Sequence, residues 1–162
     1  MINDYKAAVD IYSQTIYRLA FSGTGNVSDA EDITQTVFYK LLKNRTVFSS
    51  EEHRKAWLLR VTVNEIKVFK RSAWFRKRDY SELPEICDSL DIAQQTDNKL
   101  VYDAVMKLKQ EQRMIIMLRY YYEYSCSEIS LMTGIKEETV RTRIKRAREK
   151  LKKYLKEEFG NE

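Results

Sequence analysis

The densest group of residues that could act on another molecule lies near the C-terminus. Between Lys136 and Lys153 the chain carries nine Lys or Arg residues and only three acidic ones. Cations at this density suit the phosphates of a nucleic acid, because phosphate contacts dominate the affinity of such complexes. The alternative at this point is an ordinary amphipathic helix with a basic, solvated face.

The same segment has the pattern of a helix-turn-helix. Residues 125–133 predict a short helix that Ser125 and Glu128 begin with a capping box. Gly134 suits the left-handed conformation of a tight turn, and a long helix is predicted over residues 136–158. Its apolar residues fall on one stripe: Val140, Ile144, Ala147 and Leu151. An inward stripe beneath a polar, basic face is what a major-groove recognition helix requires.

The outward face and its flanks supply the candidate DNA-binding residues. They are Glu138, Thr139, Arg141, Thr142, Arg143, Lys145, Arg146 and Arg148. We expect Glu138, Thr142 and Lys145 to reach base edges, because these side chains can donate to or accept from the bases. The flanking arginines suit phosphates.

A second group mixes cations with aromatic rings. Its members are Lys67, Lys70, Arg71, Trp74, Phe75, Arg76, Lys77 and Arg78. Aromatic rings can stack on the bases of a single strand while cations follow its backbone. The alternative is that the aromatic residues are simply part of a hydrophobic core.

Nothing in the sequence predicts an enzyme. His53 is the single histidine, and Cys87 and Cys126 lie far apart without a histidine cluster, so we expect neither a metal site nor a cofactor. The acidic residues at 29, 31 and 32 are explained by the start of a helix. Two isolated cysteines and the lack of a long apolar run favour a reduced, cytoplasmic protein without membrane insertion.

The composition predicts an all-α protein. The 162 residues include one Pro and four Gly, and helix-favouring residues abound. Apolar periodicity predicts helices over residues 4–21, 28–43 and 54–72, then about 99–108 and 110–122 before the helix-turn-helix. We expect a turn at residues 22–26 and a capping box formed by Ser28 and Glu31. Apolar residues including Val68 occupy more than one side of the helix at 54–72, which predicts a central position in its bundle.

The helices divide into two groups. Residues 79–97 carry six acidic residues and no Lys or Arg, although the whole chain has a net charge of +5. We interpret this segment as an acidic linker. The prediction is therefore two small helical domains, residues 1–78 and 98–162, joined by residues 79–97.

Four stretches, in this order and spacing, resemble sigma factors of the extracytoplasmic-function (ECF) group of the sigma-70 family. They are DAEDITQTVF at residues 29–38, WLLRVTVN at 57–64, WFRKR at 74–78 leading into LPE at 83–85, and TVRTRIKRAREKL at 139–151. Three positions depart from the family pattern. Lys136 replaces a frequent Ser cap, Val68 replaces a frequent Asp, and Leu108-Lys109 replaces a frequent Leu-Pro.

The resemblance implies a role for each region. The first domain would dock on core RNA polymerase through Asp29, Asp32, Gln35 and Phe38. The same domain would open the −10 promoter element with the loop at residues 46–53, including Phe48, and with Asn64, Lys67 and Arg71. The C-terminal helix would read the −35 element as duplex, and the acidic linker would thread toward the RNA exit path.

The resemblance also implies partners: bacterial core RNA polymerase, promoter DNA and an anti-sigma factor. A monomer is expected, because no segment has sustained dimerisation heptads. The alternative is a helix-turn-helix repressor or activator that binds operators unaided, normally as a dimer. That alternative leaves the features of the first domain unexplained.

Overall fold

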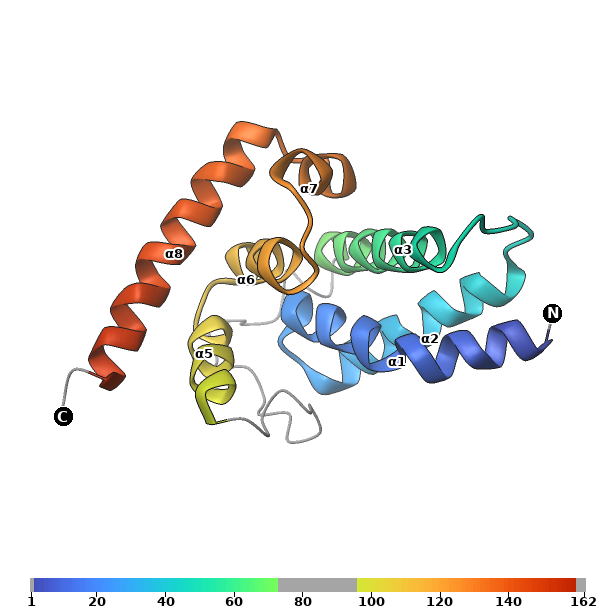
Figure 1. Cartoon of the computed structure of the whole chain (residues 1–162), viewed down its shortest axis with the longest axis horizontal. Helices are drawn as coiled ribbons and strands as arrows, with labels where there is room; N and C mark the ends of the chain where they lie inside the picture. Colours follow the sequence, from blue (N-terminus) through green and yellow to red (C-terminus); the bar gives the residue numbers. More distant parts are fainter. Residues whose placement is uncertain (1, 73–95, 160–162) are drawn as a thin grey trace. The chain divides into compact units, whose positions relative to one another are not determined.

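The computed structural model describes residues 2–72 and 96–159, and within these ranges the chain forms helices and no strand (Figure 1). The all-α prediction is therefore confirmed. The chain divides into two compact units, Met1–Glu82 and Leu83–Glu162. The acidic segment and the aromatic-basic residues 74–78 lie almost wholly outside the described ranges. Only residues 96 and 97 of the acidic segment are described, and they are helical.

Unit 1 is a bundle of three helices, α1 (Ile2–Thr24), α2 (Val27–Lys43) and α3 (Glu51–Arg71), in which each helix contacts the other two. Its core consists largely of aliphatic side chains: Ala8, Ile16, Leu19, Val37, Leu58, Leu59, Val63 and Ile66, with the ring of Phe21. Burial of these side chains from water stabilises the bundle. The expected apolar role of Val68 is wrong, because 59% of this residue is exposed.

The junction between α1 and α2 differs from the prediction. α1 continues to Thr24, so residues 22–24 are helical and do not form the predicted turn. The Thr24 hydroxyl donates a hydrogen bond to the carbonyl of Ala20. Asn26, not Ser28, caps α2, because its side-chain oxygen accepts from the backbone N–H of Asp29 at 3.0 Å. The Ser28–Glu31 capping box is therefore wrong. Because Asn26 already accepts from the N–H of Asp29, Ser28 lies within the first turn of α2 and is not its cap.

Gly23 allows α1 to lie close to α3. A Cβ atom added at Gly23 would lie 2.7 Å from the Cγ2 atom of Ile66, which is fully buried. Two carbon atoms cannot approach so closely without displacement, so the small residue sets the separation of these helices.

α3 begins earlier than predicted, at Glu51. Ser50 is its N-cap, and the Ser50 hydroxyl accepts from the backbone N–H of His53 at 3.1 Å. The polar residues of the first turn have no apolar periodicity, which is why the pattern alone placed the start at residue 54. Glu65 of α3 pairs with Lys40 of α2 and links the two helices on the surface.

Unit 2 contains α5 (Thr96–Met106), α6 (Gln110–Ile116), η2 (Met117–Tyr121), α7 (Cys126–Thr133) and α8 (Glu137–Phe159). The break between α5 and α6 forms without the family's proline, because Lys109 has an extended conformation with φ −61° and ψ 150°.

The single helix predicted over residues 110–122 is wrong in its second half. η2 is a π-helical segment, in which the N–H of Tyr122 bonds the carbonyl of Met117 at 3.0 Å. A π segment inserts one residue into a helical turn and leaves no distinctive mark in the composition.

Arg113 lies in the core of unit 2 and is only 4% exposed. Its guanidinium donates to the carbonyl oxygen of Met106 at 3.2 Å, at the end of α5, where helix carbonyls lack partners within the helix. Burial lowers the pKa of Arg113 to about 10. The sequence reading did not anticipate a buried cation here.

The helix-turn-helix forms as predicted. The Ser125 hydroxyl accepts from the N–H of Glu128 at 3.2 Å, and Gly134 has φ 77°. The hydroxyl of Ser130 donates to the carbonyl of Ile135 at 2.6 Å and closes the turn. The inward stripe of α8 is buried at Val140, Ile144 and Ala147, whereas Leu151 is half-buried.

Candidate nucleic-acid and protein interfaces

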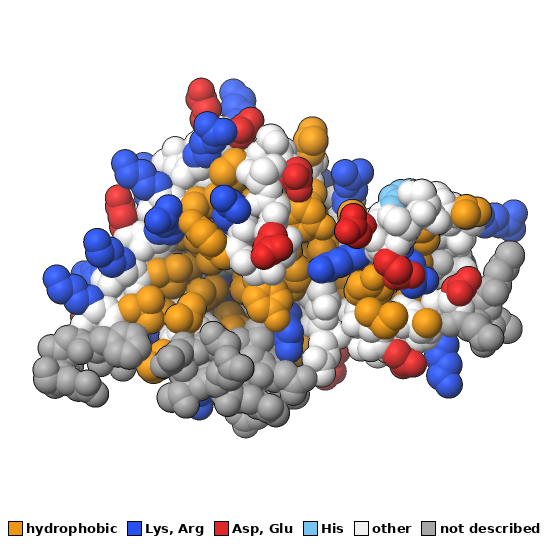
Figure 2. Space-filling model, viewed as in Figure 1, with side chains coloured by type: hydrophobic (Ala, Val, Ile, Leu, Met, Phe, Trp, Pro, Cys, Tyr) orange, Lys and Arg blue, Asp and Glu red, His pale blue; other side chains and the backbone are white. Residues whose placement is uncertain are grey.

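The outward face of α8 carries most of the predicted duplex-reading residues. Glu138, Arg141, Thr142, Lys145, Arg146 and Arg148 are exposed, and Thr139 is half-buried beside them. Figure 2 shows Lys and Arg side chains along the outer edge of α8, at the left of the view. Because the buried stripe faces the unit, this basic face is free to approach another molecule.

Two contacts organise this face. The Thr142 hydroxyl donates to the carbonyl of Glu138 at 2.9 Å, which leaves its oxygen lone pairs and its methyl group for a base edge. Arg141 donates to Glu137 at 2.6 Å, one helical turn earlier. Arg143 differs from the other arginines: its guanidinium lies 3.8 Å from the carboxylate of Glu111 on α6.

A hollow of about 610 Å³ adjoins the face of α8. Five of the nine residues that line it are cationic, Arg119, Arg141, Lys145, Arg148 and Lys152, and the others are Tyr120, Cys126, Ile144 and Glu149. Arg119, Tyr120 and Lys152 were missed by the sequence analysis. The spacing of Lys145, Arg148 and Lys152 already indicated one helical face, whereas the π segment that carries Arg119 and Tyr120 gave no such signal.

In unit 1, one face of α3 carries a row of polar and cationic side chains. Trp57, Arg60, Asn64, Lys67 and Arg71 follow at intervals of three or four residues, which places them along one side of the helix. Asn64 and Arg71 are exposed, and Lys67 is half-buried. Burial, and then the positive charge of Arg71, lowers the pKa of Lys67 below its ordinary value.

Phe48 lies in the loop between α2 and α3 and joins this row at Trp57. The Phe48 and Trp57 rings meet edge to face with centroids 5.7 Å apart. Phe48 also meets the ring of His53 at 5.3 Å, and the neighbouring Val47 is 89% exposed. The structure therefore brings together Phe48 and the face of α3 that carries Asn64, Lys67 and Arg71. Arg60 was absent from the predicted set, although its spacing places it in the row.

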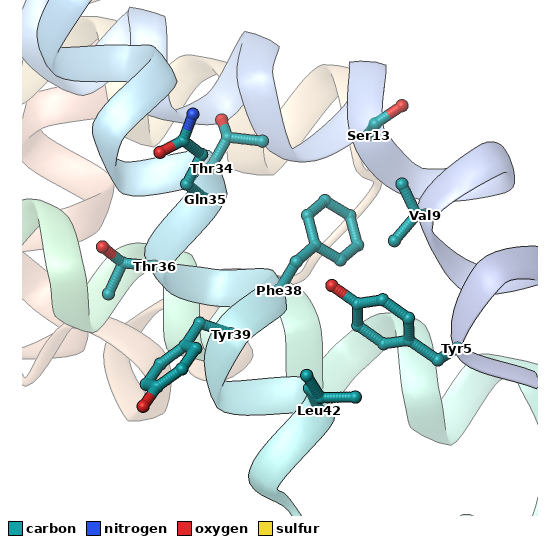
Figure 3. Close-up of a pocket in the computed structure, with 9 residues that line it drawn as sticks. All are labelled: Tyr5, Val9, Ser13, Thr34, Gln35, Thr36, Phe38, Tyr39 and Leu42. Atoms are coloured by element: carbon teal, nitrogen blue, oxygen red, sulfur yellow. The ribbon is translucent and has the colours of Figure 1, made fainter. Parts of the chain in front are cut away.

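α1 and α2 enclose a hollow of about 650 Å³ with a very different lining. Figure 3 shows Tyr5 and Val9 of α1 facing Phe38 of α2 across it, and Ser13 of α1 also lines the hollow. Phe38 is only 6% exposed, so it forms the floor of a largely apolar groove.

The outer side of α2 continues the groove. Asp32, Gln35, Tyr39 and Leu42 recur at helical spacing, and all are exposed, Tyr39 by 55% and Leu42 by 60%. Asp29 is half-buried in the first turn. The exposed Tyr39 and Leu42 were missed by the sequence analysis, although large apolar residues outside the core stripe are a usual sign of a protein contact.

Other kinds of site have no support in the described residues. No group of three or more His, Cys, Asp or Glu side chains in residues 2–72 and 96–159 could hold a metal ion. No helix within those ranges combines the length and apolar character that crossing a bilayer needs. Cys126 is a free thiol.

A helix-turn-helix with a basic outer face defines a DNA-binding protein, and comparison with known proteins identifies its family. Residues 8–76 match the family described as Sigma-70 region 2, and residues 98–151 match Sigma-70, region 4. The chain belongs to the sigma-70 family, and its similarity to the ECF RNA polymerase sigma factors SigW and SigL places it in the ECF group of that family. It is therefore an alternative sigma factor, a protein that directs transcription initiation.

Individual relatives agree with this assignment. The chain is 32% identical to the ECF RNA polymerase sigma factor SigW of Bacillus subtilis, over 92% of this chain and 87% of SigW. It is 31% identical to SigL of Mycobacterium tuberculosis, over 94% of this chain and 89% of SigL.

Two solved structures share the fold. One is the sigma factor RpoE in complex with the anti-sigma factor NepR from Bartonella quintana, with a TM-score of 0.66, 23% identity and coverage of 94% of this chain and 97% of RpoE. The other is CnrH in complex with the cytosolic domain of CnrY, with a TM-score of 0.61, 22% identity and coverage of 96% and 89%.

Proposed function

We propose that this sigma factor binds core RNA polymerase through α2, holds the melted −10 element on α3 and reads the −35 element with α8. Residues 1–78 would bind the polymerase and the −10 element, and residues 98–162 would bind the −35 element. Residues 79–97 would link these two domains. The observation that carries the proposal is α8, because its outer face combines exposed cations with Glu138 and Thr142, while Val140, Ile144 and Ala147 on its inner face are buried.

The −35 contacts divide by chemistry. Thr142, Lys145 and Glu138 face the bases of the major groove, and Thr139, Arg141, Arg146 and Arg148 lie where phosphates pass. Arg143 is near Glu111, and we assign it a phosphate contact that it makes after leaving that carboxylate. Arg119 and Lys152 extend the set, since both line the cationic hollow beside α8.

The −10 contacts need a different surface. Strand separation costs a few kcal/mol per unstacked base, and a pocket that stacks on a base offsets this cost. Phe48 supplies the aromatic surface, and Asn64, Lys67 and Arg71 continue along α3 to follow the strand. We add Arg60 to this row on the basis of its spacing.

Polymerase docking fits α2. Asp29, Asp32 and Gln35 give the helix an acidic and polar edge, while Phe38, Tyr39 and Leu42 give it apolar area. Interfaces commonly combine an apolar centre with a polar rim, and this face has both.

Further partners follow from the family. RpoE was solved in complex with the anti-sigma factor NepR, and CnrH was solved in complex with the cytosolic domain of CnrY. We extend this to the present chain as an anti-sigma factor that occupies the same surfaces. The chain acts as a monomer in the cytoplasm, without catalytic activity or a cofactor of its own. Purification from the native host with no stoichiometric partner other than polymerase would count against the anti-sigma factor.

Transcription by purified core polymerase tests the proposal. A pool of host promoter fragments is transcribed with and without this protein, and start sites are mapped. New transcripts that share a −10 and a −35 element support the proposal. If no new transcript starts, but the protein alone protects duplex DNA, the chain is a repressor or activator instead.

A further inference from the structure

The loop between α2 and α3, residues 44–50, is tethered at both ends. At its start, the side-chain oxygen of Asn44 accepts from the N–H of Thr46 at 3.3 Å. At its end, Ser50 caps α3 and accepts from the N–H of His53. Between these tethers lie Val47, which is 89% exposed, and Phe48, the aromatic residue of the loop.

His53 contacts the loop from the first turn of α3. Its Nδ1 atom accepts from the backbone N–H of Ser49 at 3.1 Å and lies 3.3 Å from the Ser49 hydroxyl. Its ring and that of Phe48 meet edge to face, with centroids 5.3 Å apart. The one histidine of the chain thus touches the residue proposed to meet a base and the residue that follows it.

These contacts define the state of the ring. Because Nδ1 accepts a hydrogen bond, the neutral ring carries its proton on Nε2. A side chain in this position must therefore supply one acceptor atom toward Ser49 and a flat surface toward Phe48.

The start of α3 does not depend on the His53 ring. Ser50 provides the cap by binding the backbone N–H of residue 53, which any residue there retains. A separate clasp joins α1 to α3: the Tyr12 hydroxyl donates to the Glu51 carboxylate at 2.9 Å, and Arg54 pairs with Glu51. Arg54 also donates to the carbonyl of Asp4 at 3.3 Å. The contacts of the His53 ring described above are therefore those with Ser49 and Phe48 of the loop.

We propose that His53 is a positioning residue that holds Ser49 and Phe48 in the conformation that receives the non-template strand of the −10 element. It acts through the loop and not by contact with the DNA. The inference rests on the proposed function of unit 1 and extends it, because it assigns the shape of the strand-binding loop to one acceptor atom. Neither Trp57 nor the Ser50 cap can replace that atom, since neither bonds the N–H of Ser49 in the structure.

Three variants of the full chain, assembled with core polymerase, separate the parts of this role. His53→Phe keeps a ring against Phe48 and removes the acceptor. His53→Asn restores an acceptor near the position of Nδ1. Lys55→Ala changes another exposed residue of the same turn and serves as the control.

The probe is a fluorescent single-stranded oligonucleotide with the non-template −10 sequence of a promoter found by the transcription assay. We expect His53→Phe to weaken its binding about three- to ten-fold, the effect of one lost hydrogen bond. His53→Asn should regain most of the affinity, and Lys55→Ala should match the wild type. Binding of a −35 duplex, core affinity and thermal unfolding should stay unchanged in all three.

The outcomes are distinct. If wild-type holoenzyme does not bind the −10 strand, the proposed function fails before His53 is tested. If wild type binds and His53→Phe binds equally well, the positioning role is wrong. The positioning role is also wrong if His53→Asn restores none of the lost strand affinity. It is wrong as well if His53→Phe weakens core binding or lowers the unfolding temperature together with strand binding.

Discussion

Two hollows of nearly equal size, one in each unit, differ in the charge of the residues that line them. The hollow between α1 and α2 measures about 650 Å³, and all nine residues that line it are uncharged, among them Tyr5, Val9 and Phe38. The hollow beside α8 measures about 610 Å³, and five of its nine lining residues are Lys or Arg. Size therefore says nothing about the partner, whereas the lining is the basis on which we propose a protein partner for one surface and a nucleic acid for the other.

The comparison has a measurable consequence. Binding through cations and phosphates releases counterions, so its affinity falls steeply as salt rises. Binding through the apolar surface of the groove depends much less on salt, because burying apolar surface releases no counterions. The two interfaces should therefore respond differently to salt and to the loss of a charge.

The largest effect is expected from Asp32→Arg on the exposed side of α2. We expect the partner surface that accommodates the Asp32 carboxylate to be positively charged. An arginine at this position would place two positive charges together, which costs several kcal/mol. We expect core polymerase affinity to fall about 100-fold, equivalent to roughly 2.7 kcal/mol. Fluorescence-detected binding of labelled sigma to core polymerase measures this change.

The control for Asp32→Arg is Asp103→Arg, which makes the same charge change at an exposed site on α5. Equal losses in the two variants would mean that net charge matters and the edge of the groove does not. Full transcription by the Asp32→Arg protein would contradict the docking assignment.

A smaller effect is expected from Arg148→Ala in the cationic hollow. One phosphate contact is lost, so affinity for a duplex −35 fragment should fall about ten-fold at physiological salt. The slope of log affinity against log salt should decrease by about 1. Titration of the fragment at several salt concentrations measures both quantities. Lys109→Ala, at the exposed residue that precedes α6, should change neither quantity. An unaltered slope for Arg148→Ala would remove Arg148 from the phosphate contacts.

A still smaller effect is expected from Thr142→Val. The hydroxyl hydrogen is bonded to the Glu138 carbonyl, so the substitution removes an acceptor and keeps a branched side chain of similar size. We expect a change of about five-fold, near 1 kcal/mol, in preference at one base pair of the −35 element, with little change in overall affinity. Competition among fragments with single base-pair changes measures this. A uniform loss across all fragments would instead assign Thr142 to the backbone contacts.

Apolar periodicity explains why some of these surfaces could be predicted from sequence. The buried stripe of α8 follows a 3.6-residue repeat, so Val140, Ile144 and Ala147 fix which residues point outward. The helix-turn-helix needed only local signals in addition, the Ser125 cap and the left-handed Gly134. The core of α2 was equally regular, which placed Asp32 and Gln35 outside.

Other features depend on contacts that a sequence pattern does not contain. Asn26 and Ser28 are both good cap residues, and the positive φ of 70° at Gly25 helps place Asn26 at the helix start. Arg113 is buried because it bonds a carbonyl of another helix, whereas a pattern assigns arginine to the surface. Arg119 and Tyr120 reach the cationic hollow through a π segment, and Tyr39 and Leu42 are exposed although their types suggest a core.

The smallest predicted effect is the loss of a stabilising contact in unit 1 at low pH. The α1–α3 clasp is in unit 1, where hydrogen bonds from Arg54 and then Tyr12 hold the pKa of the Glu51 carboxyl below its ordinary value of 4.5. The folded state therefore favours the charged form of Glu51. Its contribution is complete above pH 4.5 and is lost as the pH falls through the lowered pKa.

Thermal unfolding of wild type and Glu51→Gln between about pH 6 and about pH 3 measures this contribution. We expect the wild type to be slightly more stable at the upper end and the difference to disappear at the lower end, because protonated Glu51 and Gln are both neutral. Glu52→Gln, at the next exposed residue of α3, is the control and should follow the wild type throughout. A difference between wild type and Glu51→Gln that persists in acid would mean that the substitution acts through packing. The α1 wall of the apolar groove would then be held without the charge of Glu51.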